Sequence, residues 1–152
     1  MNIIDAVRYA ENNEDVKKLY DFFLGSAFTC ITEDENITEW TLIFYNPKTN
    51  RTIDCCVNDN FITLGEETQA LSKFEKLNVL DIKISVEDAI DRAKSDVKKG
   101  IVNILITLHK KEIPIWRIGV VTNDIAITSF DINAINGEII KKEETSLIRE
   151  VK

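Results

Sequence analysis

The feature that most constrains the fold is a helix-start signature that occurs twice, each time ahead of strand-forming segments. Asn2 and Ser85 each stand three residues before a carboxylate, Asp5 and Asp88 respectively. Such side chains accept hydrogen bonds from the unpaired amides of a first helical turn, and the carboxylates stabilise the positive helix end. Each signature therefore predicts a helix that opens one half of the chain.

Apolar residues recur at helical spacing behind both starts. The second stripe covers residues 86–97, and Gly100 supplies a stop after it. The first stripe covers residues 3–23 and is interrupted at residues 12–13, two asparagines that either kink or split the helix. Gly25 is expected to end it.

Segments with strand character follow each helix. Trp40, Leu42 and Phe44 alternate with Thr41 and Ile43, as expected for a half-buried strand. The links between segments are short, which favours antiparallel neighbours. The sequence therefore predicts an α+β fold, in which each helix packs on an antiparallel sheet. The expected strands are residues 27–31, 37–45, 51–57, 61–64, 101–109, 113–122, 125–133 and 138–141, with a linking helix over 67–77.

The same element order in both halves suggests an internal duplication. The helix starts align at a spacing of 83 residues, the turns at 46–50 and 133–137 align at 87, and Trp40 aligns with Trp116 at 76. Capping and turn chemistry also recur by chance, so duplication stays a hypothesis. Because small units make marginal cores alone, we expect both to share one compact domain. The expected parts are a helix-plus-strands unit at 1–65, a linking segment at 66–80 and a second unit at 81–145.

Composition limits the classes of partner. The chain of 152 residues is 44% hydrophobic and carries a formal charge of −7, so it repels phosphate backbones and non-specific nucleic-acid binding is not expected. Apolar runs are far shorter than the roughly 20 residues of a membrane span. The first residues lack the pattern of an export signal, and three cysteines do not form an even set. These features predict a cytoplasmic protein with reduced thiols and no membrane contact.

No familiar catalytic, cofactor-binding or metal-binding motif is present. His109 is expected on the less buried side of its strand, and the sequence identifies neither the oriented carboxylate nor the nucleophile that a catalytic base needs. A metal site from His109 with Cys30, Cys55 and Cys56 lacks the usual ligand spacing. Two carboxylate pairs in expected loops are interpreted as solvated charges rather than acid–base dyads, namely Glu33 with Glu35 and Glu66 with Glu67.

The two tryptophans leave two interpretations open. Trp40 and Trp116 both lie in alternating strands, which favours packing in the core. The alternative places Trp116 together with Arg117 on an exposed sheet face, where aromatic and Arg side chains are favoured contacts for a partner protein.

The second half resembles a PepSY-type domain over about residues 82–142. Residues 85–93 are similar to the helix S-x-E-E-A-I-x-x-A, residues 114–118 to the aromatic strand, and residues 133–139 to the turn D-A-x-T-G-E-I of that family. A tandem of two PepSY-like units is an open alternative. The resemblance implies a domain that restrains or binds another protein.

Two residues depart from the family turn, since Asn133 replaces its aspartate and Asn136 its threonine. Both asparagines still favour turns. Domains of this family typically lie outside the cytosol, attached to membrane proteins or peptidase precursors, and the expected cytoplasmic location differs from that pattern. Fold transfers through the resemblance better than function does.

These observations favour a non-enzymatic binding or regulatory module without a cofactor, for a protein or a small ligand. The alternative is an enzyme or enzyme subunit with an unrecognised carboxylate-based site, which predicts a pocket where carboxylates or His109 converge. Self-association through an uncapped sheet edge is a third hypothesis. The expected partner is thus a protein or a second copy of this chain.

Overall fold

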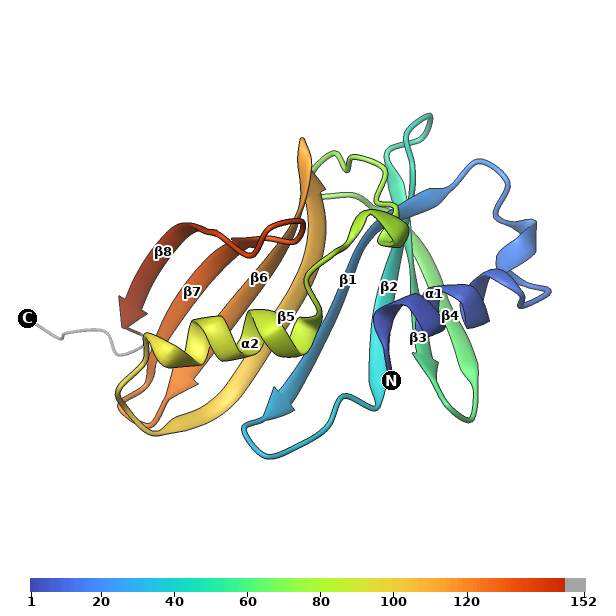
Figure 1. Cartoon of the computed structure of the whole chain (residues 1–152). Coiled ribbons are helices and arrows are strands. Elements are labelled where there is room, and N and C mark those ends of the chain that lie inside the picture. Colours follow the sequence, from blue (N-terminus) through green and yellow to red (C-terminus); the bar gives the residue numbers. More distant parts are fainter. Residues whose placement is uncertain (147–152) are drawn as a thin grey trace, which may run out of the picture.

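The computed structural model describes residues 1–146 and contains one eight-stranded antiparallel sheet with two α-helices (Figure 1). The strand order is β4-β3-β2-β1-β5-β6-β7-β8, so that β1 and β5 pair at the centre. In chain order the elements are α1 (Ile3–Glu11), η1 (Val16–Lys18), β1 (Phe23–Thr32), β2 (Glu39–Asn46), β3 (Arg51–Asn58), β4 (Ile62–Gln69), η2 (Val79–Asp81), α2 (Val86–Ser95), β5 (Ile101–Lys111), β6 (Ile113–Thr122), β7 (Ala126–Asn133) and β8 (Ile139–Ser146).

Each half of the chain places one helix ahead of four consecutive strands. Every strand pairs antiparallel with its neighbours, and the halves meet where β1 pairs with β5. Figure 1 shows α1 lying across the strands of the first half and α2 across those of the second, on the same face of the sheet. The predicted α+β class with antiparallel strands is confirmed, although strands outweigh helices in the structure.

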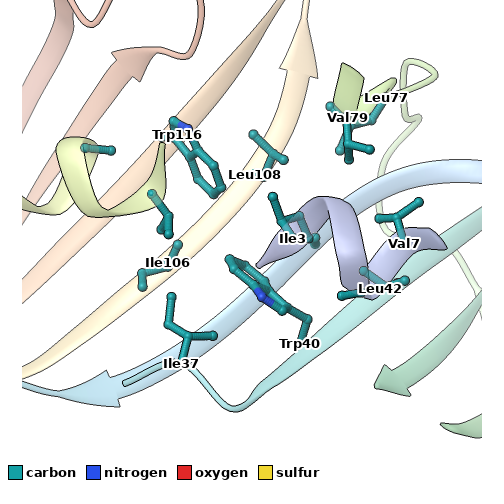
Figure 2. Packing of buried hydrophobic residues seen from close by; sticks show 14 of the residues in the cluster. Ile3, Val7, Ile37, Trp40, Leu42, Leu77, Val79, Ile106, Leu108 and Trp116 are labelled. Atoms are coloured by element: carbon teal, nitrogen blue, oxygen red, sulfur yellow. The ribbon is translucent and has the colours of Figure 1, made fainter. Parts of the chain in front are cut away.

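The core lies between the two helices and this face of the sheet (Figure 2). Strand alternation sends Trp40 and Leu42 of β2, and Leu108 and Trp116 of β5 and β6, toward the helices, where all four are fully buried. The rings of Trp40 and Trp116 have centroids 6.2 Å apart. Both halves therefore contribute to one continuous core, and each helix closes its own part of it with small side chains such as Ala6.

Both helices start where their capping residues predict. The Asn2 side chain accepts a hydrogen bond from the amide of Ile4 at 2.7 Å, and the Ser85 hydroxyl accepts one from the amide of Asp88 at 3.1 Å. Ser85 thereby makes the N-cap bond that a serine at this position is known for.

The interruption expected at residues 12–13 is present, since α1 ends at Glu11, but the prediction that the helix continues to Gly25 is wrong. The side chain of Asn13 accepts hydrogen bonds from the amides of Asp15 and Val16, which diverts the chain from the helix. After the single turn η1, the chain enters β1 at Phe23, and Gly25 lies within that strand. The apolar residues after Asn13 thus belong to a turn and a strand rather than to one long stripe.

The predicted linking helix over 67–77 is also wrong. Strand β4 continues to Gln69 because its residues keep pairing with β3, as far as Arg51 opposite Gln69. Beyond β4 the chain has no regular structure until η2. Leu77, one of the apolar residues that suggested a helix, is buried and donates its amide hydrogen to the carbonyl oxygen of Leu24 at 2.8 Å.

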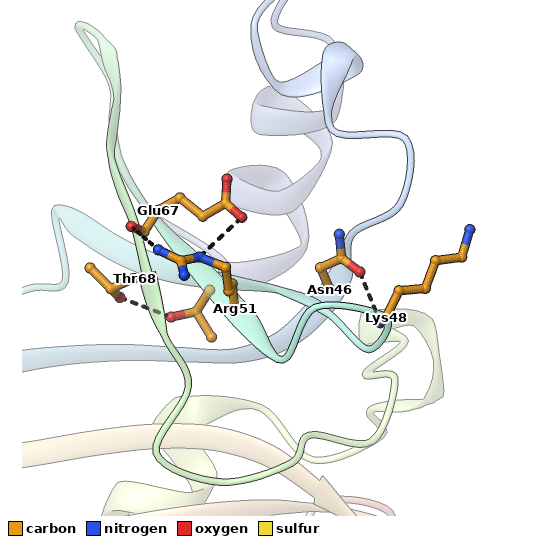
Figure 3. Close-up of polar contacts among 6 residues, drawn as sticks. Asn46, Lys48, Arg51, Glu67 and Thr68 are labelled. Carbon is orange, nitrogen blue, oxygen red and sulfur yellow. Dashed lines mark hydrogen bonds and ion pairs between the residues drawn. The ribbon is translucent and has the colours of Figure 1, made fainter.

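Polar contacts hold the edge strand β4 onto β3 (Figure 3). The Arg51 Nε lies 3.4 Å from a carboxylate oxygen of Glu67, and the Thr52 and Thr68 hydroxyls are 3.3 Å apart. The turn that leads into β3 is closed by Asn46, whose side chain accepts the amide hydrogen of Lys48 at 2.9 Å. The turn predicted at residues 46–50 is therefore confirmed.

Candidate binding pocket

A pocket of about 550 Å³ opens between α1, η1, the first residues of β1 and the segment that precedes and enters η2. Its volume falls within the range of small-molecule sites in proteins. Its inner walls are mostly apolar side chains, half-buried or buried, and they come from several elements of the first half of the chain. They are Ile4, Val7, Val16, Leu19, Phe22, Phe23, Leu24, Phe44, Leu77 and Val79.

Local hydrogen bonds place the walls of this pocket. The turn capped by Asn13 brings buried Val16 beneath the end of α1. On the opposite side, the bond from Leu77 to Leu24 fixes the incoming segment against β1. One residue later, the Asn78 side chain accepts the amide hydrogen of Leu80 at 3.0 Å and starts η2. Three short segments are thereby held apart around a cavity instead of collapsing into it.

Three cationic side chains and one carboxylate line the mouth of the pocket. Arg8 lies on α1, Lys17 on η1 and Lys76 on the segment before η2, and the carboxylate is that of Glu11. All four residues are exposed. Arg8 has a weak ion pair with Asp5 at 4.0 Å, in which both side chains are more than two-thirds exposed. Within residues 1–146, the ammonium groups of Lys17 and Lys76 have no ion-pair partner.

The structure separates the two residues considered as a partner contact. Trp116 is fully buried and donates its indole hydrogen to the carbonyl oxygen of Ile84 at 2.9 Å, so the favoured interpretation, packing in the core, is confirmed and the alternative on an exposed face is wrong. Adjacent strand residues point to opposite faces, and Arg117 accordingly lies on the face away from the helices. There its guanidinium forms two hydrogen bonds with Asp131, at 2.8 and 3.1 Å. Contact of a partner with Arg117 stays a prediction.

His109 lies on the same face as Arg117 and is half-buried. Burial lowers the pKa of its imidazole, and the positive charges of Arg117 and Lys111 lower it further, while Asp131 opposes them. Burial by itself would raise the pKa of Asp131, but hydrogen bonds and charge from Arg117 hold that pKa below its ordinary value. These effects favour the neutral form of the imidazole, which lies near a carboxylate that is already paired with an arginine.

The three cysteine thiols are free. Burial raises the pKa of Cys55 to about 11, and burial together with a hydrogen bond to Glu39 raises that of Cys56 to about 11. At neutral pH both are protonated thiols and poor nucleophiles. Cys30 is exposed on β1. Among residues 1–146, no group of three or more side chains of the metal-binding types is placed to hold an ion.

The carboxylate pairs considered as dyads have other contacts. Glu33 lies 3.5 Å from the Lys94 ammonium group. Glu35 accepts the amide hydrogen of Thr32 at 2.9 Å, and hydrogen bonds to Thr32 lower its pKa. Glu67 forms the ion pair with Arg51. Their contacts are those of surface charges, as the sequence suggests, but the expected loop position is wrong for Glu66 and Glu67, which lie in β4.

The pocket itself is not foreseen from the sequence. The sequence does mark two of the wall residues, Val16 and Leu19, as apolar. Because they continue the apolar spacing of α1 past the two asparagines, however, they suggest one longer helix instead of a pocket wall. Leu77 likewise suggests a helix by its spacing. The missing information is that both segments are irregular and lie opposite each other, which depends on contacts between distant parts of the chain.

Comparison with known proteins agrees with this fold. The model of the PepSY family, described as "Peptidase propeptide and YPEB domain", matches residues 83–143, which confirms the resemblance seen in the second half. A crystal structure of a "putative lipoprotein" from Clostridium difficile 630 is similar with a TM-score of 0.64 and 15% sequence identity, over 95% of this chain and 93% of that one. No curated protein matches the sequence significantly.

These comparisons reach different parts of the chain. The family match is confined to the second half, whereas the similar crystal structure covers both halves and shows that the complete arrangement occurs in another protein. At this level of identity the likeness concerns the fold alone. Within residues 1–146 no helix is long and apolar enough to cross a bilayer.

Proposed function

We propose that this protein is a non-enzymatic binding module and that the pocket beside α1 is its binding site. The observation that carries the proposal is an apolar cavity of about 550 Å³ whose mouth opens among Arg8, Lys17 and Lys76. Filling such a cavity removes apolar surface of both ligand and protein from water, which is the main driving force for binding at concave sites. The match of the second half to PepSY, a family description that includes peptidase propeptides, is compatible with a binding role.

We further propose that the two halves are tandem PepSY-like units. The boundary expected at residue 65 falls within β4 (Ile62–Gln69), so the first unit extends to the end of that strand and the linking segment begins after it. The indole of Trp40 donates to the carbonyl oxygen of Met1, and that of Trp116 donates to that of Ile84, both at 2.9 Å. Met1 and Ile84 each directly precede the capping residue of a helix. The same side chain thus makes the same bond at the same place in both halves, which supports a common origin for them.

A cytoplasmic location and a protein partner remain proposals from the sequence. The similar crystal structure is described as that of a lipoprotein, a class held at a membrane surface, which favours the opposite location. Fractionation of the native cells, with detection in the cytosolic and membrane fractions, decides between them. Recovery with the membrane fraction would overturn the cytoplasmic proposal.

Binding at the pocket is tested with N-phenyl-1-naphthylamine, a neutral apolar probe whose fluorescence rises on transfer from water. We expect one probe molecule per chain. In Leu19→Trp the larger side chain occupies the cavity from its wall, so the dissociation constant of the probe should rise by about tenfold, which corresponds to roughly 1.4 kcal/mol of binding free energy.

The matched control is Ile90→Trp, which enlarges an apolar side chain on α2 that is also partly buried against the core. This variant should bind the probe as the unchanged protein does. Urea unfolding of both variants shows that each is folded under the conditions of the assay. Equal probe binding by the unchanged protein and Leu19→Trp would overturn the pocket as the binding site.

A further inference from the structure

We propose that the ligand of this pocket is an amphipathic anion, a chain of apolar carbons that ends in a carboxylate. This inference rests on the proposed function and names the chemical class that the same site takes. It follows from three properties of the pocket: the sign of the charge at its mouth, the apolar character of its interior, and the hydrogen bond that already occupies the backbone carbonyl of Leu24 in its wall.

The charge at the mouth is opposite to the charge of the molecule as a whole. The chain has a formal charge of −7, yet Arg8, Lys17 and Lys76 outnumber Glu11 around the pocket. These cations come from three separate segments that converge on one opening. An anionic group at the mouth therefore meets attractive charge from several sides, whereas a cationic group meets repulsion.

The interior is suited to a hydrocarbon chain. Buried Val7, Leu24 and Leu77 lie behind the charged mouth, and Phe44 closes the side of β2. Leu80 also lines the pocket and is 65% exposed, so it offers apolar surface at the entrance. Each methylene group transferred from water onto such surface gains roughly 0.8 kcal/mol.

A peptide fits the pocket less well, because its backbone needs hydrogen-bonding partners. Phe44 of β2 is paired on both sides, with Leu24 of β1 and Ile53 of β3, whereas Leu24 is paired with β2 alone because the pairing of β1 with β5 begins at Ser26. The Leu24 carbonyl oxygen at the wall already accepts the amide hydrogen of Leu77. A ligand whose single polar group stays at the mouth brings no polar atom of its own into the interior of the pocket, so none is left there without a hydrogen-bonding partner.

The test compares three probes that share one hydrocarbon chain: dodecanoate, dodecanol and dodecyltrimethylammonium. Each is titrated below its micelle concentration against bound N-phenyl-1-naphthylamine. We expect dodecanoate to displace the fluorescent probe at one equivalent and to bind at least about tenfold more tightly than the cationic amphiphile.

The double variant Lys17→Gln/Lys76→Gln removes two of the cations and keeps the length of both side chains. It should weaken dodecanoate binding by about threefold to tenfold and leave dodecanol unchanged, because exposed charge pairs each contribute modestly. The matched control Lys110→Gln/Lys111→Gln removes the same charge from the hairpin between β5 and β6, and should leave both affinities unchanged.

Three results separate the two proposals. If all three amphiphiles bind equally and the Lys17/Lys76 variant changes none of them, the anion specificity is overturned while the pocket stays a binding site. If dodecanoate binds preferentially but Leu19→Trp leaves its affinity unchanged, the anion binds elsewhere, and the inference is overturned as well. Failure of the neutral probe to bind at all would overturn the proposed function itself.

Discussion

The two halves of the molecule share the parts that build the core and differ in the segment that follows the helix. In the second half, residues 96–100 lead directly from α2 into β5. In the first half, residues 12–22 lie between α1 and β1, and they include η1 and the pocket wall around Val16. The pocket thus lies where the first half of the chain differs most from the second, in the segment between its helix and its first strand.

The halves also differ on the face of the sheet that the helices leave open. Arg117 follows Trp116 and pairs across the strands with Asp131, forming a two-point ion pair. Thr41 follows Trp40 and pairs with Cys56 at the corresponding place in the first half. At this place the second half therefore carries an ion pair and the first half a neutral pair, although the core beneath is alike.

The largest effect is expected from removing either tryptophan. Trp40→Ala and Trp116→Ala should each lower the free energy of unfolding by about 3–5 kcal/mol, because each deletes a fully buried indole and leaves a cavity. Since both side chains occupy one shared core and make the same bond, we expect the two losses to agree within about 1 kcal/mol. Urea unfolding followed by circular dichroism measures both.

The control for this pair is Tyr20→Ala, at a side chain that is 87% exposed, which should change stability little. A Trp116→Ala variant as stable as the unchanged protein would contradict the buried position of Trp116. A large loss for one tryptophan and a small loss for the other would break the equivalence of the two halves.

A smaller effect is expected at the two helix starts. Asn2→Ala and Ser85→Ala should each cost about 1 kcal/mol of unfolding free energy, because each leaves an amide of the first helical turn without its side-chain acceptor. The two losses should add in the double variant, since the caps belong to separate helices. The same urea measurement applies.

Asn2→Ser and Ser85→Asn are the matched controls, because each keeps a capping oxygen and should restore most of the stability. If either alanine variant proves as stable as its control, the side-chain cap of that helix is not stabilising. The two helices would then differ: the start of one would depend on its side-chain cap, and the start of the other would depend on packing.

How far the sequence predicts the structure differs between these regions for a physical reason. Capping and strand alternation are local, so the starts at Asn2 and Ser85 and the inward side of β2 follow from neighbouring residues. Leu19 and Leu77 have the right spacing for helices, but Asn13 ends one helix and the pairing of β4 with β3 prevents the other. The pocket arises because neither of these two segments forms a helix and because they contact each other although they are distant in the sequence. Short-range sequence patterns do not encode such contacts.

The burial of Trp116 illustrates the same limit. Alternation assigns Trp116 and Arg117 to opposite faces, but it does not tell which face the helices cover. The position of α2 decides which side of β6 is buried. Trp116 lies on the buried side, where its indole donates a hydrogen bond to the carbonyl oxygen of Ile84. The sequence therefore predicts the alternation on β6 while leaving the identity of its buried side open.

The smallest effect concerns the charged face of the second half. His109 is the single histidine of the chain, so one imidazole signal in a proton NMR titration reports its pKa directly. We expect that pKa to lie below its ordinary value of 6.5, because burial and Arg117 disfavour the charged form. The unfolded chain then binds this proton more readily than the folded one, so His109 lowers stability as the pH falls through 6.5 toward the folded pKa.

Arg117→Thr gives this face the residue that the first half has at the same place, and it removes a cation near His109. The imidazole pKa should therefore rise toward its ordinary value, and the loss of stability below pH 6.5 should become smaller. Asp131→Asn removes the neighbouring carboxylate instead and should move the pKa further down. A pKa that stays the same in both variants would show that burial alone sets it, and the charge difference between the two halves would then have no effect on the buried imidazole.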